Sequence, residues 1–343
     1  MISVHIRSLT KAWSPRYVLN EVLPHSVASI LMLLPVTVQA QPILHGQFRG
    51  HELTGESIAQ VTCSSSSMRF ATVTSDGSAK VWNADGTLLR RYQPALPAML
   101  FNGRFEGPED SGFVVAAYNG FTSLWSTSDE APRSLGPNLS GTTDTQPLFD
   151  HGALVTSSDD GSIRYWSLEG TLLKRIERPG VSRHLAYSHP LQLIAATQDI
   201  GTVTFLSPDG SQLNILKTDQ GRLNDVVFSP SKPLMFTGGF DGTVKVWDLS
   251  QGVRGVTLLR TIPAPAGAGW LEGLAVNTNG VIASAYDDGI LRFWNLKGDN
   301  LGQISLASGL HLFSVCFAPD QQTVRTITQD GTVSTVVFKA TGH

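Results

Sequence analysis

Residues 240–247 read FDGTVKVW, and this stretch predicts a tight turn followed by a strand that ends in tryptophan. Asp-Gly between two apolar stretches is a strong hairpin signal, because a two-residue primed turn needs positive φ and glycine adopts it easily. The residues after Gly242 include Thr243, Val244 and Val246, and β-branched residues are enriched in strands. The stretch therefore indicates one corner of an antiparallel sheet.

The same pattern recurs along the chain. An apolar residue stands five positions after the turn glycine in all seven copies, and it is tryptophan in five of them. The turn glycines lie at 77, 120, 161, 201, 242, 289 and 331, so the repeats are 40 to 47 residues apart. The other six copies are SDGSAKVW (75–82), YNGFTSLW (118–125), DDGSIRYW (159–166), DIGTVTFL (199–206), DDGILRFW (287–294) and QDGTVSTV (329–336). A period of this length indicates a repeat architecture.

Each repeat contains four short strand candidates. A second turn and strand follow the tryptophan, as in SLEGTLLKRI (167–176), and two strands precede the turn, as in LNDVVFSPSKPLMFTGG (223–239). Repeated units of four antiparallel strands are the blades of a β-propeller. The sequence therefore predicts an all-β fold over residues 41–343, a seven-bladed β-propeller of four-stranded antiparallel blades.

These repeats resemble those of the WD-repeat β-propeller family, in a bacterial-type, exported form; another propeller family is the alternative. The literal Trp-Asp pair occurs once, at Trp247-Asp248, but the period and the Gly-to-Trp spacing recur over about 300 residues. In that family the turn Asp typically accepts hydrogen bonds that link the turn to the Trp indole and to a His from the preceding loop. The resemblance implies a structural turn network made of His51, Thr72, Asp76, Trp82, Asp160, Trp166, Asp241, Trp247, Asp288 and Trp294.

The copies differ in how much of this network they can form. Gly50-His51 is the only recognisable Gly-His head, so only the first blade can assemble the complete network. Blade four has Ile200 at the Asp position and Leu206 at the Trp position. We expect its packing to rest on apolar burial alone, which would make it a weak blade.

The two ends of the chain complement each other. After TVSTVVF (332–338) only five residues remain, so the last blade is one strand short. The opening stretch HGQFRGHEL (45–53) is a spare strand, and its Gly-Gln matches the one in LGQISLASG (301–309), the outer strand of blade six. We expect residues 43–49 to supply the outer strand of blade seven and to close the ring.

Two cysteines, Cys63 and Cys316, fall on the predicted innermost strands of blades one and seven. These blades are neighbours in a closed ring. The two cysteines occupy strand positions that differ by one, and successive strand residues point to opposite faces. Their sulfurs therefore either meet at the seam or point apart. A disulfide is possible there, but we expect two buried free thiols.

The first 40 residues differ in kind from the rest. Three basic residues stand against one acid, and a mostly apolar run follows over residues 27–38. This run is shorter than the roughly 20 residues that span a bilayer, and small residues at 38 and 40 suit a cleavage site. Residues 1–40 therefore predict a signal peptide, a periplasmic or extracellular mature protein and no transmembrane segment in the mature chain. The alternatives are a buried or interfacial helix and an uncleaved anchor.

Composition argues against several kinds of function. The net charge is −3 and only 15% of residues are charged, so no basic surface for nucleic acid is expected. The nine histidines and two cysteines have no metal-ligand spacing, and no nucleophile elbow or phosphate-binding glycine loop is present. Asp159-Asp160 and Asp287-Asp288 are interpreted as turn residues rather than catalytic pairs. We therefore predict no catalytic residues, no metal and no cofactor.

Three aromatic residues are candidates for a binding rim. Trp270 follows PAPAGAG (263–269) and lies outside both the repeat position and the leader. Tyr118 and Phe240 directly precede the turn Asn or Asp of their blades. Loops on a rigid scaffold commonly carry recognition, and interface hot spots favour Trp and Tyr. The alternative is that Trp270 packs into blade six and the other two rings fold back over their own hairpins.

These observations favour an exported, non-enzymatic platform or scaffold that binds another protein. The alternatives are a secreted propeller enzyme or small-ligand binder, with its site at the mouth of the central channel, and a structural subunit of an envelope complex. The architecture alone does not decide among them, because one fold supports many functions.

Overall fold

The computed structural model describes residues 41–51, 59–92, 98–106, 110, 112–118, 120, 122–126, 133–135 and 141–339. They belong to one compact unit that spans Val38–His343. The predicted signal peptide, residues 1–40, lies outside the described residues, as do Asn119 and the side chain of Trp125.

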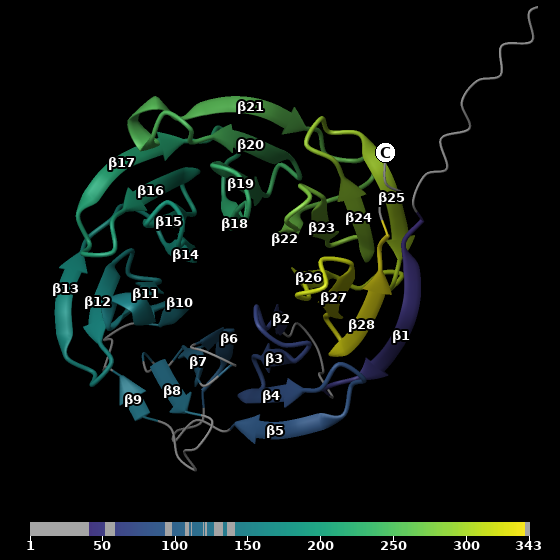
Figure 1. The fold of residues 1–343 in the computed structure, drawn as a ribbon, viewed down its shortest axis with the longest axis horizontal. Helices are drawn as coiled ribbons and strands as arrows, with labels where there is room; N and C mark the ends of the chain where they lie inside the picture. Colours follow the sequence, from purple (N-terminus) through teal and green to yellow (C-terminus); the bar gives the residue numbers. More distant parts are fainter. Residues whose placement is uncertain are drawn as a thin grey trace, which may run out of the picture. The chain divides into compact units, whose positions relative to one another are not determined.

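The described strands form seven four-stranded antiparallel sheets, the blades, arranged in a ring (Figure 1). Residues of the innermost strands line a central channel. From the innermost strand outward, blades one to three are β2 (Ala59–Cys63), β3 (Phe70–Thr74), β4 (Ser78–Trp82) and β5 (Leu88–Tyr92); β6 (Leu100–Glu106), β7 (Gly112–Ala117), β8 (Thr122–Ser126) and β9 (Arg133–Leu135); and β10 (Thr142–Leu148), β11 (Ala153–Ser158), β12 (Ile163–Ser167) and β13 (Leu172–Ile176).

The remaining blades follow the same order. They are β14 (Ser182–Ser188), β15 (Leu193–Gln198), β16 (Thr202–Leu206) and β17 (Gln212–Lys217); β18 (Leu223–Phe228), β19 (Leu234–Gly239), β20 (Val244–Asp248) and β21 (Thr257–Ile262); β22 (Leu271–Val276), β23 (Ile282–Tyr286), β24 (Ile290–Trp294) and β25 (Asn300–Ser305); and β26 (Leu312–Phe317), β27 (Thr323–Thr328), β28 (Thr332–Val337) and β1 (Ile43–Arg49). Two short 3₁₀ turns are described, η2 (Phe149–His151) and η3 (Val253–Gly255). This arrangement confirms the predicted seven-bladed propeller.

The core lies between neighbouring blades. The second strand of a blade is buried on both faces, as in β15 and β19, whereas the outermost strand is largely exposed, as in β13. One cluster joins Phe236 and Val244 of blade five to Leu271 and Ile282 of blade six. Each blade therefore depends on both neighbours to cover its apolar faces.

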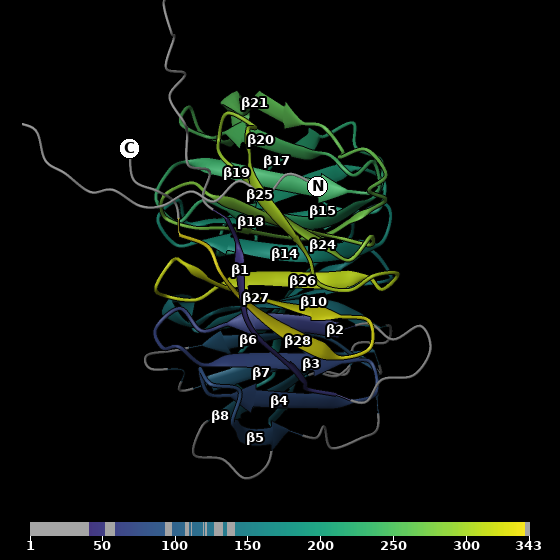
Figure 2. The ribbon, with the colours of Figure 1, turned by 90° about the vertical axis from the view of Figure 1, so that its right-hand side faces the viewer.

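The ring closes through the N-terminal strand, as the sequence predicts. β1 pairs antiparallel with β28, with Gln47 opposite Ser334 and Phe48 opposite Val333, and both views place the two strands side by side (Figures 1 and 2). The Phe48 ring also packs edge-on against Trp82 of blade one, with 4.9 Å between centroids. The strand thus completes blade seven and contacts blade one.

Cys63 and Cys316 form a disulfide across the same seam, with Cα atoms 5.6 Å apart. The expectation of two free thiols was therefore wrong. Blade five explains why: the residue equivalent to Cys316, Val227, packs toward blade six, whereas the residue equivalent to Cys63, Phe228, packs toward blade four. Cys316 of blade seven therefore points toward blade one, and Cys63 of blade one points toward blade seven, so the sulfurs meet.

Loss of the disulfide should destabilise the protein. The double variant Cys63→Ser with Cys316→Ser should unfold with a free energy lower by about 2 to 5 kcal/mol, because the unfolded chain regains the freedom that the cross-link removes. Urea unfolding measures this difference, and wild-type protein in reductant is the matched comparison. Equal stability of the oxidised protein and the double variant would contradict a structural role for the bond.

Candidate functional site

The turn network of blade one is complete. Trp82 Nε1 donates to Thr72 Oγ1 at 2.8 Å, and Thr72 Oγ1 lies 2.7 Å from His51 Nε2. His51 Nδ1 lies 2.8 Å from Ser78 Oγ, and the Ser78 backbone N–H donates to Asp76 at 2.9 Å. A chain of hydrogen bonds therefore joins the buried indole to the turn carboxylate.

His51 is a neutral connector in this chain. Burial lowers the pKa of its imidazole to about 4, and the nearby Lys80 ammonium adds to the effect. Since the Trp82 indole donates to Thr72, the Thr72 hydroxyl hydrogen is available for His51 Nε2, which leaves Nδ1–H to donate toward Ser78. Both ring nitrogens are used inside the fold.

The other described tryptophans of the repeat position are held in the same way. Their indoles donate to a hydroxyl on the neighbouring strand, Trp166 to Thr156 at 3.0 Å, Trp247 to Thr237 at 2.9 Å and Trp294 to Ser284 at 2.8 Å. The turn acid of blade five, Asp241, accepts the Thr243 backbone N–H at 3.0 Å. These tryptophans therefore lie in the interior of their blades.

Arginine takes the place of the missing histidine in blades three and six. Arg164 Nη2 donates to Asp160 at 2.6 Å, and Arg292 Nη2 donates to Asp288 at 2.6 Å. The second acid of each Asp-Asp pair is thus bound within its own hairpin, which supports its interpretation as a turn residue. These arginines were not among the predicted network residues, although in both blades an Arg stands two positions before the Trp.

Blade four uses an amide instead of an acid. Leu206 is buried and Ile200 is 52% exposed. Gln198 Oε1 accepts hydrogen bonds from Thr202 Oγ1 at 2.9 Å and from Thr204 Oγ1 at 3.2 Å. The expectation of packing by apolar burial alone was therefore wrong, because a polar network replaces the lost turn acid.

Two of the three rim candidates meet. The rings of Phe240 and Trp270 stack with centroids 4.5 Å apart and planes 5° from parallel, and the Arg222 guanidinium lies 4.4 Å from the Phe240 centroid. Trp270 is 44% exposed, so it does not pack into the core of blade six. This set of three residues is called the aromatic stack below.

Tyr118 lies elsewhere on the rim. Its ring meets Phe101 edge-on with centroids 5.4 Å apart, and a Cβ at Gly141 would lie 2.5 Å from it. Tyr118 is 46% exposed. It therefore bridges blades two and three while keeping part of its ring open to solvent.

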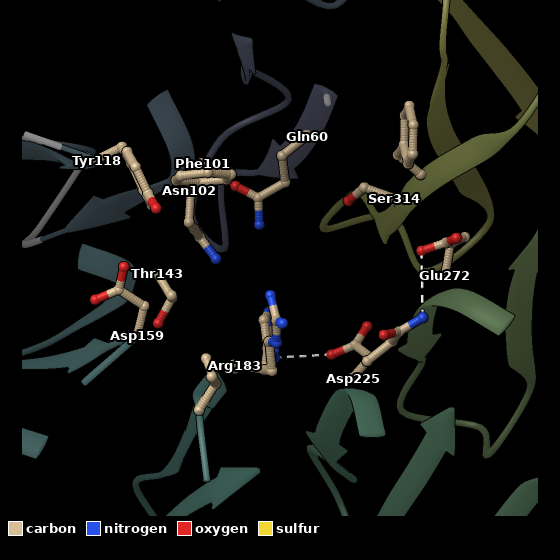
Figure 3. Close-up of a pocket in the computed structure, with 14 residues that line it drawn as sticks. Gln60, Phe101, Asn102, Tyr118, Thr143, Asp159, Arg183, Asp225, Glu272 and Ser314 are labelled. Atoms are coloured by element: carbon tan, nitrogen blue, oxygen red, sulfur yellow. Dashed lines mark hydrogen bonds and ion pairs between the residues drawn. The ribbon is translucent and has the colours of Figure 1, made fainter. Parts of the chain in front are cut away.

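A cavity of about 320 Å³ opens at the channel mouth, and among its lining residues Tyr118 was the one binding candidate found in the sequence. The innermost strands of blades two to seven each carry a register shift near their start, and the residues there line the cavity (Figure 3). Bulges of this kind re-aim side chains. Six residues contribute in this way: Phe101, Thr143, Arg183, Asn224, Glu272 and Phe313. Gln60 of blade one lines the cavity from a strand whose pairing with β3 is regular.

Charged side chains next to these residues tie neighbouring blades together. His184 Nδ1 lies 2.8 Å from Asp225, and Arg104 Nη2 lies 3.1 Å from Asp144. Burial alone would lower the pKa of His184, but the Asp225 and Asp144 carboxylates outweigh it and raise that pKa. Asp225 also accepts the Leu274 backbone N–H of blade six at 2.7 Å. These groups are structural cross-links between blades.

Comparison with known proteins now decides the family. The family model "WD domain, G-beta repeat" matches residues 43–83 and 210–248. An uncharacterized WD repeat-containing protein of Synechocystis sp., slr1410, is 39% identical over 83% of this chain and 83% of its own length. The chain belongs to the WD-repeat family.

Shorter similarities agree with this assignment. A second WD repeat-containing protein of Synechocystis sp., slr1409, is 37% identical over 21% of this chain and 22% of its own length. WD repeat-containing protein 90 of Homo sapiens is 26% identical over 54% of this chain and 12% of its own length. One family-model match begins on the outer strand β1 and the other begins two residues before the outer strand β17. Each ends one residue after the Trp of the next blade, so the WD repeat unit overlaps two blades.

Two features are not found in the described part of this WD-repeat protein. No group of three or more His, Cys, Asp or Glu side chains is arranged there to hold a metal ion. Nor does that part contain a helix with the length and apolar character that a membrane span needs.

The His51 network makes stability depend on pH. Because the unfolded chain titrates His51 at its ordinary pKa of 6.5 and the folded protein titrates it at about 4, the free energy of unfolding should fall as pH drops from 6.5 to 4. The slope from this group is at most about 1.4 kcal/mol per pH unit.

Chemical unfolding across this pH range checks the prediction. His51→Gln should flatten the slope, whereas His189→Gln, which removes a side chain that is 74% exposed, should leave it unchanged. The same slope in all three proteins would refute the assignment.

Proposed function

We propose that this WD-repeat propeller is an exported, non-enzymatic platform that binds another protein at the channel mouth. WD40 propellers are generally non-enzymatic scaffolds and typically bind proteins. The observation that carries the proposal is the aromatic stack, because it holds a large apolar ring in solvent at a fixed orientation. Trp and Arg are the residue types most enriched at interface hot spots.

The contrast with the other tryptophans supports this reading. Trp82, Trp166, Trp247 and Trp294 are 4 to 7% exposed, and each donates its indole N–H inside its own blade. Trp270 is 44% exposed and rests on Phe240 instead. Phe240 already holds the Trp270 ring in one orientation. Covering that ring with a partner would therefore cost little further conformational entropy.

Further apolar side chains extend the surface around the mouth. The Tyr118 backbone N–H donates to the Met99 carbonyl, and the Phe240 N–H donates to the Arg222 carbonyl. In these two blades, therefore, the turn before the third strand lies beside the loop that leads into the first strand. Met99, Tyr118, Ile200 and Trp270 are 44 to 52% exposed. Tyr118 also lines the cavity at the channel mouth, and an exposed Tyr ring there favours a protein interface.

Export is supported by the disulfide. Disulfides persist in oxidising compartments such as the periplasm or the extracellular space and are rare in the cytosol. The Cys63–Cys316 bond, whose half-cystines are 253 residues apart, would suit a protein delivered there by the predicted leader. N-terminal sequencing of the exported protein tests this part of the proposal, and a mature chain starting near Gln41 is expected.

Trp270→Ala should weaken partner binding at least tenfold, as expected for a hot spot worth about 2 kcal/mol, with little change in thermal stability. Partners are recovered from the exported fraction with the full chain as bait. Leu259→Ala, which truncates an apolar residue that is 52% exposed on the outer strand β21, is the matched control. Equal recovery with both variants would argue against this rim, and catalytic turnover by the purified protein would favour the enzyme alternative.

A further inference from the structure

Three side chains direct N–H groups into the channel-mouth cavity, and these N–H groups have no hydrogen-bond partner among the described residues. The side chains of Gln60, Asn102 and Arg183 point into the same central space (Figure 3). The Gln60 carbonyl accepts the Gly103 backbone N–H at 2.8 Å, which leaves its amide N–H groups toward the cavity. The side chains of Asn102 and Arg183 form no hydrogen bond with other described residues.

Three other polar side chains of the lining already donate hydrogen bonds within the protein. Thr143 donates to the Ser182 carbonyl at 2.6 Å, Ser314 donates to the Val61 carbonyl at 3.0 Å, and Asn224 donates to the Leu271 carbonyl at 2.9 Å. These bonds join neighbouring blades. Donors from three other side chains are thus left for a ligand at the centre.

Arg183 lines the cavity and has no close counter-ion among the described residues. In the described part of the chain no carboxylate oxygen lies within 4.0 Å of its guanidinium. Three acids line the cavity: Asp225 is bound to His184 and backbone N–H groups, Asp159 lies at the rim beside Gly141, and Glu272 accepts from Asn224 at 3.3 Å. Burial, reinforced by Asp287, raises the pKa of Glu272 to about 7, which weakens its negative charge at neutral pH.

The walls of the cavity are partly aromatic. Phe101 and Tyr118 stand on one side, and Phe313 stands across the seam on blade seven. A planar guanidinium with flanking amide donors suits a carboxylate, which accepts several hydrogen bonds at once. The aromatic walls suit an apolar body attached to it.

We infer that the channel mouth binds a carboxylate of the protein partner, held by Arg183, Gln60 and Asn102. This inference rests on the proposed function for the identity of the ligand. The carboxylate belongs to a partner side chain or to its C-terminus, and both present the same chemistry to the three donors.

Calorimetric titration of the full chain with matched small probes tests the inference. One pair is N-acetylphenylalanine and its amide, which represent a C-terminus. The other is N-acetylglutamate amide and N-acetylglutamine amide, which represent a side chain. In at least one pair the acid should bind at least tenfold more tightly than the neutral probe, with a Kd of about 1 mM, and the pair that responds identifies the source.

Variants assign the effect to the site. Arg183→Gln should remove most of the preference for the acid, and Arg183→Lys should retain part of it because the charge remains without the planar fork. Arg260→Gln, the same charge change on the outer strand β21, should leave the preference intact. Equal binding of acid and amide, a preference that survives Arg183→Gln, or no binding of any probe would overturn the inference. These probes require no partner, so the result is separate from partner recovery at the rim.

Discussion

Pairing between β1 and β28 is the constraint on which the rest of the structure depends. Each blade buries its faces against two neighbours, so a ring open at one seam would expose the apolar faces of blades one and seven. The seam cluster contains Val61, Phe70 and Trp82 from blade one and Ile327 and Val333 from blade seven. β1 holds this seam at its outer edge, and the disulfide holds it near the channel. Closure therefore combines backbone hydrogen bonds, apolar burial and one covalent bond.

The candidate site depends on the same closure. Residues from the innermost strands of all seven blades line it, and they converge only because the strands form a ring. Gln60 and Phe313 lie on opposite sides of the seam, so a shift between blades one and seven would move a donor and an aromatic wall apart. The aromatic stack likewise joins blades five and six. Rigid packing between blades thus fixes the positions of groups that a partner would meet.

The sequence predicted the features that depend on local pattern. Short stretches of the sequence show the Asp-Gly turns, the Gly-to-Trp spacing and the missing last strand. These features were sufficient to predict the seven blades and the position of β1 in blade seven. The disulfide could not be predicted, because it depends on which face each cysteine presents. Apart from Tyr118, the residues that line the cavity were missed, because a bulge that turns Arg183 or Glu272 toward the channel has no clear sequence signal. Phe240 and Trp270 were each identified, but their contact follows from the packing of two blades.

Hydrogen exchange on the full chain lacking residues 43–49, with the disulfide intact, tests the central claim most directly. If β1 closes the ring, amides of β28 and β2 should lose protection first and most, while β15 on the opposite side of the ring keeps more of its protection. The melting temperature of the shortened chain should also fall. Unchanged protection of β28 and β2, together with an unchanged melting temperature, would contradict the account of closure.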